Sequence, residues 1–232
     1  NPDPPGSMVV VSLEPTFRVM DRSGMATSTR KVAVDLWGGL LPDRDPSQLV
    51  RELYEAENRH RSEPSGSQDM IGLVYPGVNR LDYDYAHQGG IFPVHIESNN
   101  SPEVARWLEA VINMVPIAQR PERYDPLAVK NLDPNWIARL GASGRDCYRA
   151  IVDMDAGALG ASMNECMLAW EKLLPNVVKH EAVDLLEILH FYQSRYGGAM
   201  YSGCGGGYLY VVSPEAVPGS ISISVRTRSS SG

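Results

Sequence analysis

The pattern of apolar and polar positions in the first hundred residues predicts short strands and helices in turn. β-Branched and apolar residues dominate positions 9–20 and favour one or two strands there. Gly38 and Gly39 end the first apolar helical stretch, and Pro46 suits the first turn of the second. The expected elements of this part are strands at 9–20, 78–82 and 90–98 and helices at 31–37, 45–60 and 70–74.

Helical spacing dominates the second half of the chain. Four prolines in residues 113–134 indicate an ordered but irregular connection. Three helices are expected after it, near 134–154, 156–173 and 180–195, and strands at 208–212 and 221–225 follow. In the last helix the residues expected to face the core are Val183, Leu186, Ile188 and Leu189. Because strands and helices mix without strict alternation, the sequence predicts the α+β class.

Composition and charge limit the possible partners. The 232 residues are 43% hydrophobic and 21% charged, which is ordinary for a globular protein. The net charge of −7, without a basic run, argues against nucleic acid as a partner. No apolar stretch approaches the about 20 residues that span a bilayer, and the first residues show no secretory signal. We therefore expect no membrane partner and a cytoplasmic location.

The cysteines and histidines show no metal-ligand spacing. Cys147, Cys166 and Cys204 are an odd number without a CxxC pair, and the five histidines are scattered. This argues against both a disulfide framework and a zinc site.

Three segments carry the candidate chemistry. Residues 23–29 (SGMATST) offer glycine and small hydroxyl residues at a helix start, which suits phosphate, although such clusters usually only cap the helix. Residues 66–69 (GSQD) place a carboxylate that could act as a general base, although most such aspartates are solvated or cap a helix. Residues 197–207 contain six glycines, which permit close approach to a ligand or form a crowded structural turn.

In this order the three segments resemble motifs of the GHMP-type small-molecule kinases. They are similar to the second motif, the catalytic-aspartate segment and the glycine-rich third motif of that family, and NECMLAWEKLLPN resembles the helix before the third motif. The Gly-x-Gln-Asp form is similar to heptose-phosphate kinases and the kinase half of fucose-salvage enzymes. The resemblance covers about residues 9–226. It implies a two-part α+β fold: an incomplete N-terminal α/β portion (1–95) with the phosphate loop and catalytic aspartate, and a ferredoxin-like C-terminal portion (96–232).

The resemblance also implies roles for particular residues. Asp69 would be the catalytic residue that orients or deprotonates the attacking hydroxyl, with ATP and Mg²⁺ as cofactors. Ser28 and Glu57 would hold the Mg²⁺, which prefers oxygen ligands. The residues implied to bind the nucleotide are Gly24, Ala26, Thr27, Ser28, Gly203, Gly205 and Gly206.

The chain departs from the family pattern in two ways. The family's first motif is not found before Ser23, so we expect a fragment, a sequence from which residues have been omitted, or a shortened homologue. Ala26 stands in place of a glycine, Met200 stands where many relatives carry lysine, and Cys204, expected to be an inert thiol, replaces a small alanine. An alanine at position 26 would be strained if the loop required a positive φ.

Two arginines in the proline-rich connection are candidates for the acceptor site. Arg120 and Arg123 could bind a phosphate or carboxylate of the acceptor through paired hydrogen bonds, although a surface salt bridge is a commoner role.

The sequence thus predicts a kinase that phosphorylates a sugar or sugar-phosphate hydroxyl. Two alternatives stay open: a catalytically impaired relative that binds a nucleotide or a protein, and a kinase for a non-sugar alcohol. A homodimer is also possible.

Overall fold

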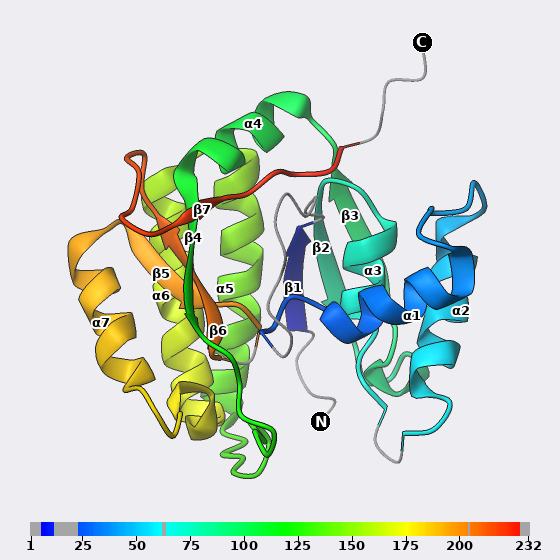
Figure 1. Cartoon of the computed structure of the whole chain (residues 1–232), viewed down its shortest axis with the longest axis horizontal. Helices are drawn as coiled ribbons and strands as arrows, with labels where there is room; N and C mark the ends of the chain where they lie inside the picture. Colours follow the sequence, from blue (N-terminus) through cyan, green and yellow to red (C-terminus); the bar gives the residue numbers. More distant parts are fainter. Residues whose placement is uncertain (1–5, 12–22, 62–63, 204, 228–232) are drawn as a thin grey trace.

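The computed structural model describes residues 6–11, 23–61, 64–203 and 205–227, which contain two antiparallel sheets (Figure 1). The three-stranded sheet has the order β1-β2-β3 and the four-stranded sheet the order β5-β6-β4-β7. The strands of the first are β1 (Gly6–Val11), β2 (Val78–Tyr83) and β3 (His95–Asn99). Those of the second are β4 (Ile112–Ala118), β5 (Gly198–Tyr201), β6 (Gly207–Val212) and β7 (Ile221–Ser222).

Three helices accompany the three-stranded sheet: α1 (Thr27–Trp37), α2 (Pro46–Asn58) and α3 (Gln68–Val74). The Asp45 carboxylate accepts from the Ser47 N–H at 3.1 Å, and Pro46 occupies the first turn of α2, so this start follows from local sequence. Together these elements bury an apolar cluster made of Leu49, Val50, Leu53, Met70, Ile71, Val74 and Leu81.

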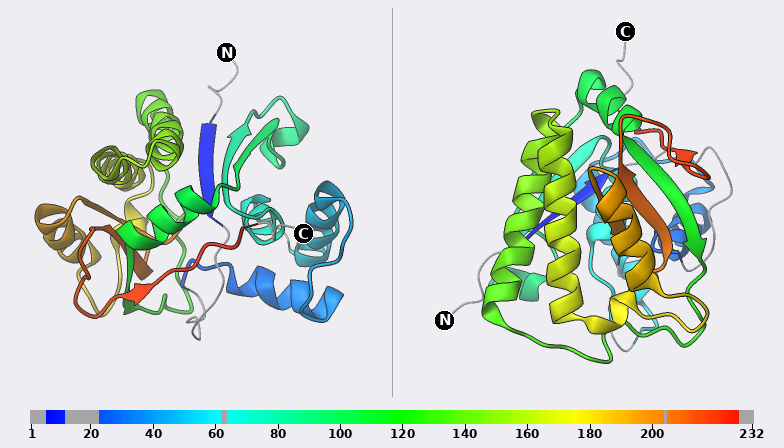
Figure 2. Two further views of the ribbon diagram at one scale, coloured as in Figure 1. Left: turned by 90° about the horizontal axis from the view of Figure 1, so that it is seen from above. Right: turned by 90° about the vertical axis from the view of Figure 1, so that its left-hand side faces the viewer.

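Three helices of the second half, α5 (Pro134–Val152), α6 (Ala156–Leu173) and α7 (Leu185–Arg195), lie side by side in the right-hand view of Figure 2. Helices α6 and α7 pack against β5 and β6 of the four-stranded sheet, and α5 packs against α6. Helix α4 (Pro102–Val111) leads directly into β4. Two short 3₁₀ helices, η1 (Gln88–Gly90) and η2 (Pro175–Val178), complete the fold. None of the described helices combines the length and the apolar composition needed to cross a bilayer.

The two sheets share one core, because α5 packs on both α6 and β1. Gly144 in α5 lies so close to β1 that a Cβ there would overlap the Ser7 carbonyl. The chain also returns from the second sheet to the first after β7: the Gly77 N–H donates to the Arg226 carbonyl at 2.7 Å, and an Arg226 Nη2 donates to the Leu73 carbonyl at 2.7 Å. The division at about residue 95 stays a prediction.

Most of the expected elements are confirmed, and the α+β class with them, whereas residues 12–20 of the first expected strand region lie outside the described residues. The prediction of a wholly irregular connection at 113–134 is wrong, because β4 runs through Pro116. Proline is tolerated there since β7 pairs with β4 only at Asn113 and Met114, and the register against β6 shifts just after Pro116. The sequence analysis missed α4, although the signals are local: the Ser101 hydroxyl caps the helix by accepting from the Val104 N–H, and Pro102 occupies its first turn. It also missed the four-residue strand β5. The last helix begins at Leu185 and not at 180, so the fully buried positions are Leu185 and Leu189.

We predict that Gly160→Ala will destabilise the protein because α6 crosses β5 with no room for a side chain. A Cβ at Gly160 would overlap the Gly197 carbonyl, so backbone must move, at a cost of about 1–3 kcal/mol. The matched control is Gly157→Ala in the same helix, where the new Cβ would only contact the Asp155 Oδ1 at 3.4 Å. Urea unfolding should show a loss for the first variant and a gain of up to about 1 kcal/mol for the second. Equal effects would contradict this packing.

Candidate active site

Two turns from opposite ends of the chain meet where the sheets adjoin. We call residues 23–29 the phosphate loop, and residues 202–203 with 205–207 the glycine turn. The Ser202 hydroxyl donates to the Ser23 carbonyl at 2.6 Å, and both serines are buried. Gly24 (φ 79°) and Gly207 (φ 72°) lie at this contact, where a Cβ would overlap the Ser202 and Ser23 carbonyls respectively. The turns therefore touch backbone to backbone, which only glycine permits at these two positions.

The phosphate loop leads into α1 without a side-chain cap. Ala26, the residue before the helix, has φ 53° and ψ 35°, and its carbonyl accepts from the Arg30 N–H at 2.9 Å. The first-turn amides, those of Thr27 and Ser28 among them, have no partner within an α-helix, and together with the helix dipole they suit an anion. The Ser28 side chain is exposed, on the helix that begins here.

Glu57, near the end of α2, faces this helix start. The Ser28 hydroxyl donates to Glu57 Oε1 at 3.3 Å, and an Arg61 Nη2 donates to the same oxygen at 2.8 Å. Only 4% of the Glu57 side chain is exposed. Its Oε2 is buried and has no hydrogen-bond partner among the residues that the structure describes.

The oxygen atoms Ser28 Oγ and Glu57 Oε2 suit a magnesium ion. Mg²⁺ is commonly held by one or two protein oxygens together with substrate phosphates and water, so Ser28 Oγ and Glu57 Oε2 are sufficient protein ligands. The described residues contain no cluster of three or more histidine, cysteine or acidic side chains, which is the kind of set that a metal held by protein alone would need. An orphaned buried carboxylate oxygen costs free energy unless a cation or donor meets it.

Asp69 lies in the first turn of α3, and the loop before it is anchored by a buried serine. The Ser67 hydroxyl donates to the Ile91 carbonyl at 2.6 Å and lies 3.2 Å from the Tyr83 hydroxyl. These contacts fix the start of α3, where Asp69 lies.

Burial raises the pKa of Asp69, and the negative charge of Glu57 raises it further. The positive charges of Arg120, Arg30 and Arg61 act in the opposite direction. The Asp69 side chain is nevertheless open to solvent in part, because the carboxylate reaches water on one side while protein surrounds it on the others.

Comparisons with solved structures bear on the fold of the chain. A candidate sugar kinase from Campylobacter jejuni superposes with a TM-score of 0.57 at 15% identity, over 90% of this chain and 63% of its own. A D-glycero-D-manno-heptose 1-phosphate kinase from Bacteroides thetaiotaomicron superposes with a TM-score of 0.56 at 17% identity, over 88% and 61%. The chain has the GHMP-kinase fold. It spans about three fifths of the length of these two proteins. The sequence matches no protein-family model, and a search of curated proteins finds no match.

Within this GHMP-kinase fold the structure brings most of the expected site residues together. The phosphate loop contacts both Glu57 and the glycine turn, and Asp69 lies near enough to Glu57 for their charges to interact. Gly203, Gly205 and Gly206 have φ values of 60°, 88° and 68°. Met200 packs between two apolar clusters, which explains why an apolar residue is accepted there. Cys204 lies outside the described residues.

The two candidate arginines differ. Arg120 donates from Nε to the Gly205 carbonyl at 2.5 Å and from Nη2 to the Ser202 carbonyl at 2.9 Å. Arg123 is exposed, and no hydrogen bond or ion pair joins it to the described residues of the site. Sequence reasoning missed Arg30 and Arg61 near Asp69. Arg61 had a signal, its i,i+4 spacing from Glu57, whereas Arg30 had none.

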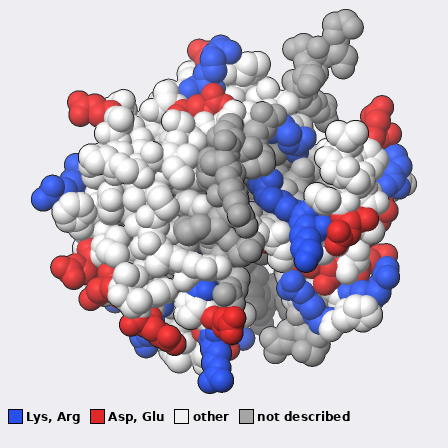
Figure 3. Space-filling view, in the orientation of Figure 1, with Lys and Arg blue, Asp and Glu red and all other residues white. Residues whose placement is uncertain are grey.

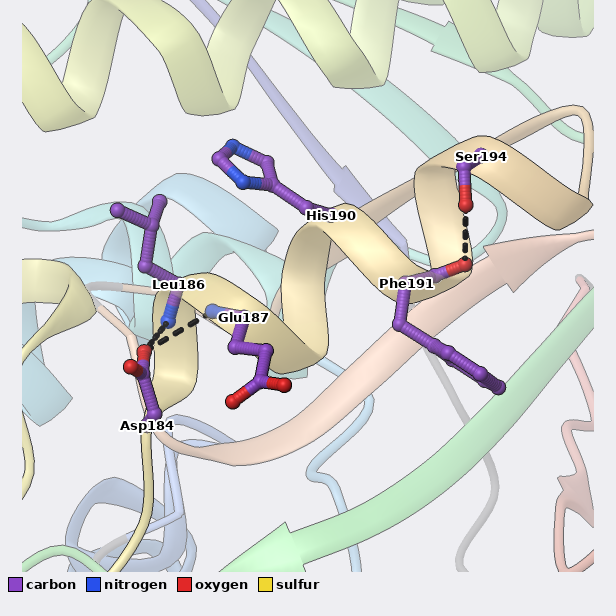
Figure 4. Close-up of a pocket in the computed structure, with 6 residues that line it drawn as sticks. All are labelled: Asp184, Leu186, Glu187, His190, Phe191 and Ser194. Atoms are coloured by element: carbon purple, nitrogen blue, oxygen red, sulfur yellow. Dashed lines mark hydrogen bonds between the residues drawn. The ribbon is translucent and has the colours of Figure 1, made fainter.

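A surface pocket elsewhere does not belong to this site. Its six residues all come from α7 or the residue before it, as Figure 4 shows: Asp184, Leu186, Glu187, His190, Phe191 and Ser194. Asp184 is occupied in capping the helix, accepting from the Leu186 and Glu187 N–H groups at 3.1 and 2.9 Å. Figure 3 shows charged side chains of both signs on the right of the molecule, over α1–α3. The left half, which includes α7, carries its charged side chains mainly around the rim and few toward the centre of the view.

Because Ala26 is strained, we predict that replacing alanine with glycine will affect the free energy of unfolding differently at positions 26 and 33. With φ 53°, Ala26→Gly relieves about 1–2 kcal/mol of left-handed strain, against about 0.4–1 kcal/mol of added unfolded-state entropy. The variant should therefore be as stable as wild type or up to about 1.6 kcal/mol more stable by urea unfolding. Ala33→Gly, inside α1, should lose about 1 kcal/mol. A clear loss in both variants would contradict the strain.

A second prediction follows from the raised pKa of Asp69. The folded state holds this proton over a pH range in which the unfolded state, with a pKa of about 3.9, has already lost it. The contribution of Asp69 to stability therefore falls as pH rises through that range. Asp69→Asn should therefore gain stability relative to wild type as the pH rises above about 4.

The control for this comparison is Asp35→Asn, an exposed position of α1. Its difference from wild type in urea unfolding should stay constant over the same pH series. If the Asp69→Asn difference also stayed constant, or shrank with rising pH, the raised pKa would be contradicted.

Proposed function

We propose that the protein is an ATP-dependent kinase that phosphorylates a hydroxyl group of a sugar or sugar phosphate. The observation that carries the proposal is the convergence of Asp69 with the Ser28–Glu57 pair and with two glycine-containing turns in contact. Phosphoryl transfer depends mainly on positioning and charge neutralisation, and these elements supply both.

The nucleotide phosphates would lie at the start of α1, against Gly24, Ala26, Thr27 and Ser28. The uncapped first-turn amides donate to phosphate oxygens, and glycine at positions 203, 205 and 206 lets the opposite turn approach without side chains. The nearby Arg30 and Arg120 add positive charge to a chain whose net charge is −7.

Ser28 and Glu57 would hold Mg²⁺, whose chemistry when bound is to neutralise charge on the β- and γ-phosphates. Ser28 Oγ offers a neutral oxygen and Glu57 Oε2 a buried, unpartnered one. Arg61 keeps Glu57 in place through the other carboxylate oxygen.

Asp69 would orient the acceptor and take its proton. The acceptor oxygen forms a bond to the γ-phosphorus while the bond from that phosphorus to the β–γ bridging oxygen breaks. ADP leaves with the electron pair of the broken bond, and the hydroxyl proton passes to the Asp69 carboxylate. A raised pKa makes Asp69 a better proton acceptor near neutral pH than an ordinary aspartate.

Two observations favour a second function, the binding of a nucleotide or another protein without catalysis. Arg61 already pairs with Glu57, and Ala26 holds a conformation that glycine would adopt without strain. Both suit a protein that keeps the fold to bind a nucleotide or another protein without catalysis. A non-sugar alcohol as acceptor is a further alternative within the kinase class.

The test is ADP release from MgATP with a panel of free and phosphorylated hexoses and heptoses and of non-sugar alcohols. Turnover should appear with one acceptor class and fall about 10²- to 10⁴-fold in Asp69→Asn. Asp35→Asn should retain full turnover, since that exposed side chain lies outside the site. ATP binding by thermal shift without turnover would favour the non-catalytic function. Absence of both would overturn the nucleotide site.

A further inference from the structure

We propose that Arg120 is a positioning residue: its guanidinium holds the glycine turn against the phosphate loop so that both turns face the same phosphate chain. The inference rests on the proposed function for its catalytic consequence, while the structural part stands on contacts within this chain. It gives Arg120 a role different from binding the acceptor.

The contacts of Arg120 reach both turns. Its Nε and Nη2 donate to the Gly205 and Ser202 carbonyls at 2.5 and 2.9 Å, so one guanidinium spans the glycine turn. The same Nη2 lies 2.7 Å from where a Cβ of Gly24 would stand, and 3.5 Å from that of Gly203. The Arg120 Cγ lies 3.2 Å from the corresponding point at Gly206. The side chain therefore occupies the space that the missing side chains leave open.

Arg120 is itself held from its own segment. It follows β4 by two residues, just beyond the register shift between Pro116 and Ala118. Its guanidinium lies 5.3 Å from the ring centroid of Tyr124, within the range of a cation–π contact. The carbonyl of the preceding residue, Gln119, lies 3.1 Å from His180 Nε2, which ties this segment to the residues before α7. Contacts of the neighbouring backbone and of the guanidinium group thus both restrain Arg120.

Geometry explains why arginine is needed at this position. Two carbonyls that belong to different residues of a turn are bridged by donors set at a fixed angle, which the planar fork of a guanidinium provides. A lysine ammonium would bring the charge but could not reproduce both bonds on one rigid plane. The substitution Arg120→Lys would therefore separate the effect of the charge from that of the fork.

The charge of Arg120 also acts on Asp69. It is the first of three arginines that lower the pKa of Asp69, the others being Arg30 on α1 and Arg61 after α2. The remaining groups that face Asp69 are Glu57 on α2, which raises its pKa, and Tyr83 on β2. Loss of the Arg120 charge should move the pKa of Asp69 further upward.

The experiment compares Arg120→Lys and Arg120→Gln with Arg106→Gln, an exposed arginine of α4 outside the site. Hydrogen exchange of the protein without ligand reads the structural role directly. The Ser202 N–H, which donates to the Tyr208 carbonyl at 2.9 Å, and the Tyr208 N–H, which donates to Ser202 Oγ at 3.3 Å, are the reporters. Both Arg120 variants should exchange at least about tenfold faster at these amides, whereas Arg106→Gln should match wild type.

Kinetics and nucleotide affinity read the functional role. Affinity for a non-hydrolysable ATP analogue should fall about tenfold or more in both Arg120 variants, with a lower kcat and little change in the acceptor KM. The low-pH limb of kcat should shift upward in Arg120→Gln and stay in place in Arg120→Lys, because lysine keeps the charge.

The outcomes separate the two proposals. Unchanged exchange at Ser202 and Tyr208 in both variants would overturn the positioning role, whatever the activity. A higher acceptor KM with unchanged analogue affinity would also overturn it and indicate an acceptor-binding residue. If wild type itself neither binds the analogue nor turns over, the proposed function fails, and the exchange rates still decide whether Arg120 holds the turns together.

Discussion

The architecture of the site depends on one backbone contact, between Ser23 with Gly24 and the turn that contains Ser202 and Gly207. The two partners lie far apart in the chain, and the Ser202–Ser23 hydrogen bond has a sequence separation of 179. Two glycines with positive φ allow the carbonyls to approach where any side chain would overlap them. The start of α1 is thereby placed against the end of β5 and the start of β6, and the orientation of its first-turn amides follows.

The electrostatics of the site depend on the charged side chains around Asp69, whose effects on the pKa of Asp69 partly cancel. Two carboxylates, Asp69 and Glu57, lie close enough for the charge of Glu57 to disfavour ionisation of Asp69, and burial adds to the cost. Three arginines from different elements offset part of this cost. A buried carboxylate oxygen of Glu57 still lacks a partner among the described residues, so the site as built favours an additional cation.

Local chemistry made part of this structure predictable from sequence. The cap of α2 at Asp45 and the end of α1 at Gly38 are signals contained within a few residues, and the three site segments were recognisable because glycine and hydroxyl residues cluster in them. The strand β4 was not predictable, because Pro116 is normally excluded from a strand that has neighbours on both sides. It is accepted here since β7 pairs with β4 only at Asn113 and Met114, before the proline. The contacts of Arg120 are likewise tertiary, and no spacing in the sequence relates position 120 to 205.

The order of strands explains why these distant residues meet. Strand β6 lies between β5 and β4, so the end of β5, the start of β6 and the end of β4 fall at the same edge of the sheet; Tyr201 pairs with Leu209, and Ala118 with Gly207. Ser202, Gly207 and Arg120 extend from that edge, and half of the site is therefore fixed by sheet register. The other half comes from α1, α2 and α3, whose position relative to the sheet is set through α5, since that helix packs on both β1 and α6. A substitution that changes the packing of α5 should therefore alter the geometry of the site although it replaces none of the site residues. The reason is that the site is assembled from two sheets that share one core.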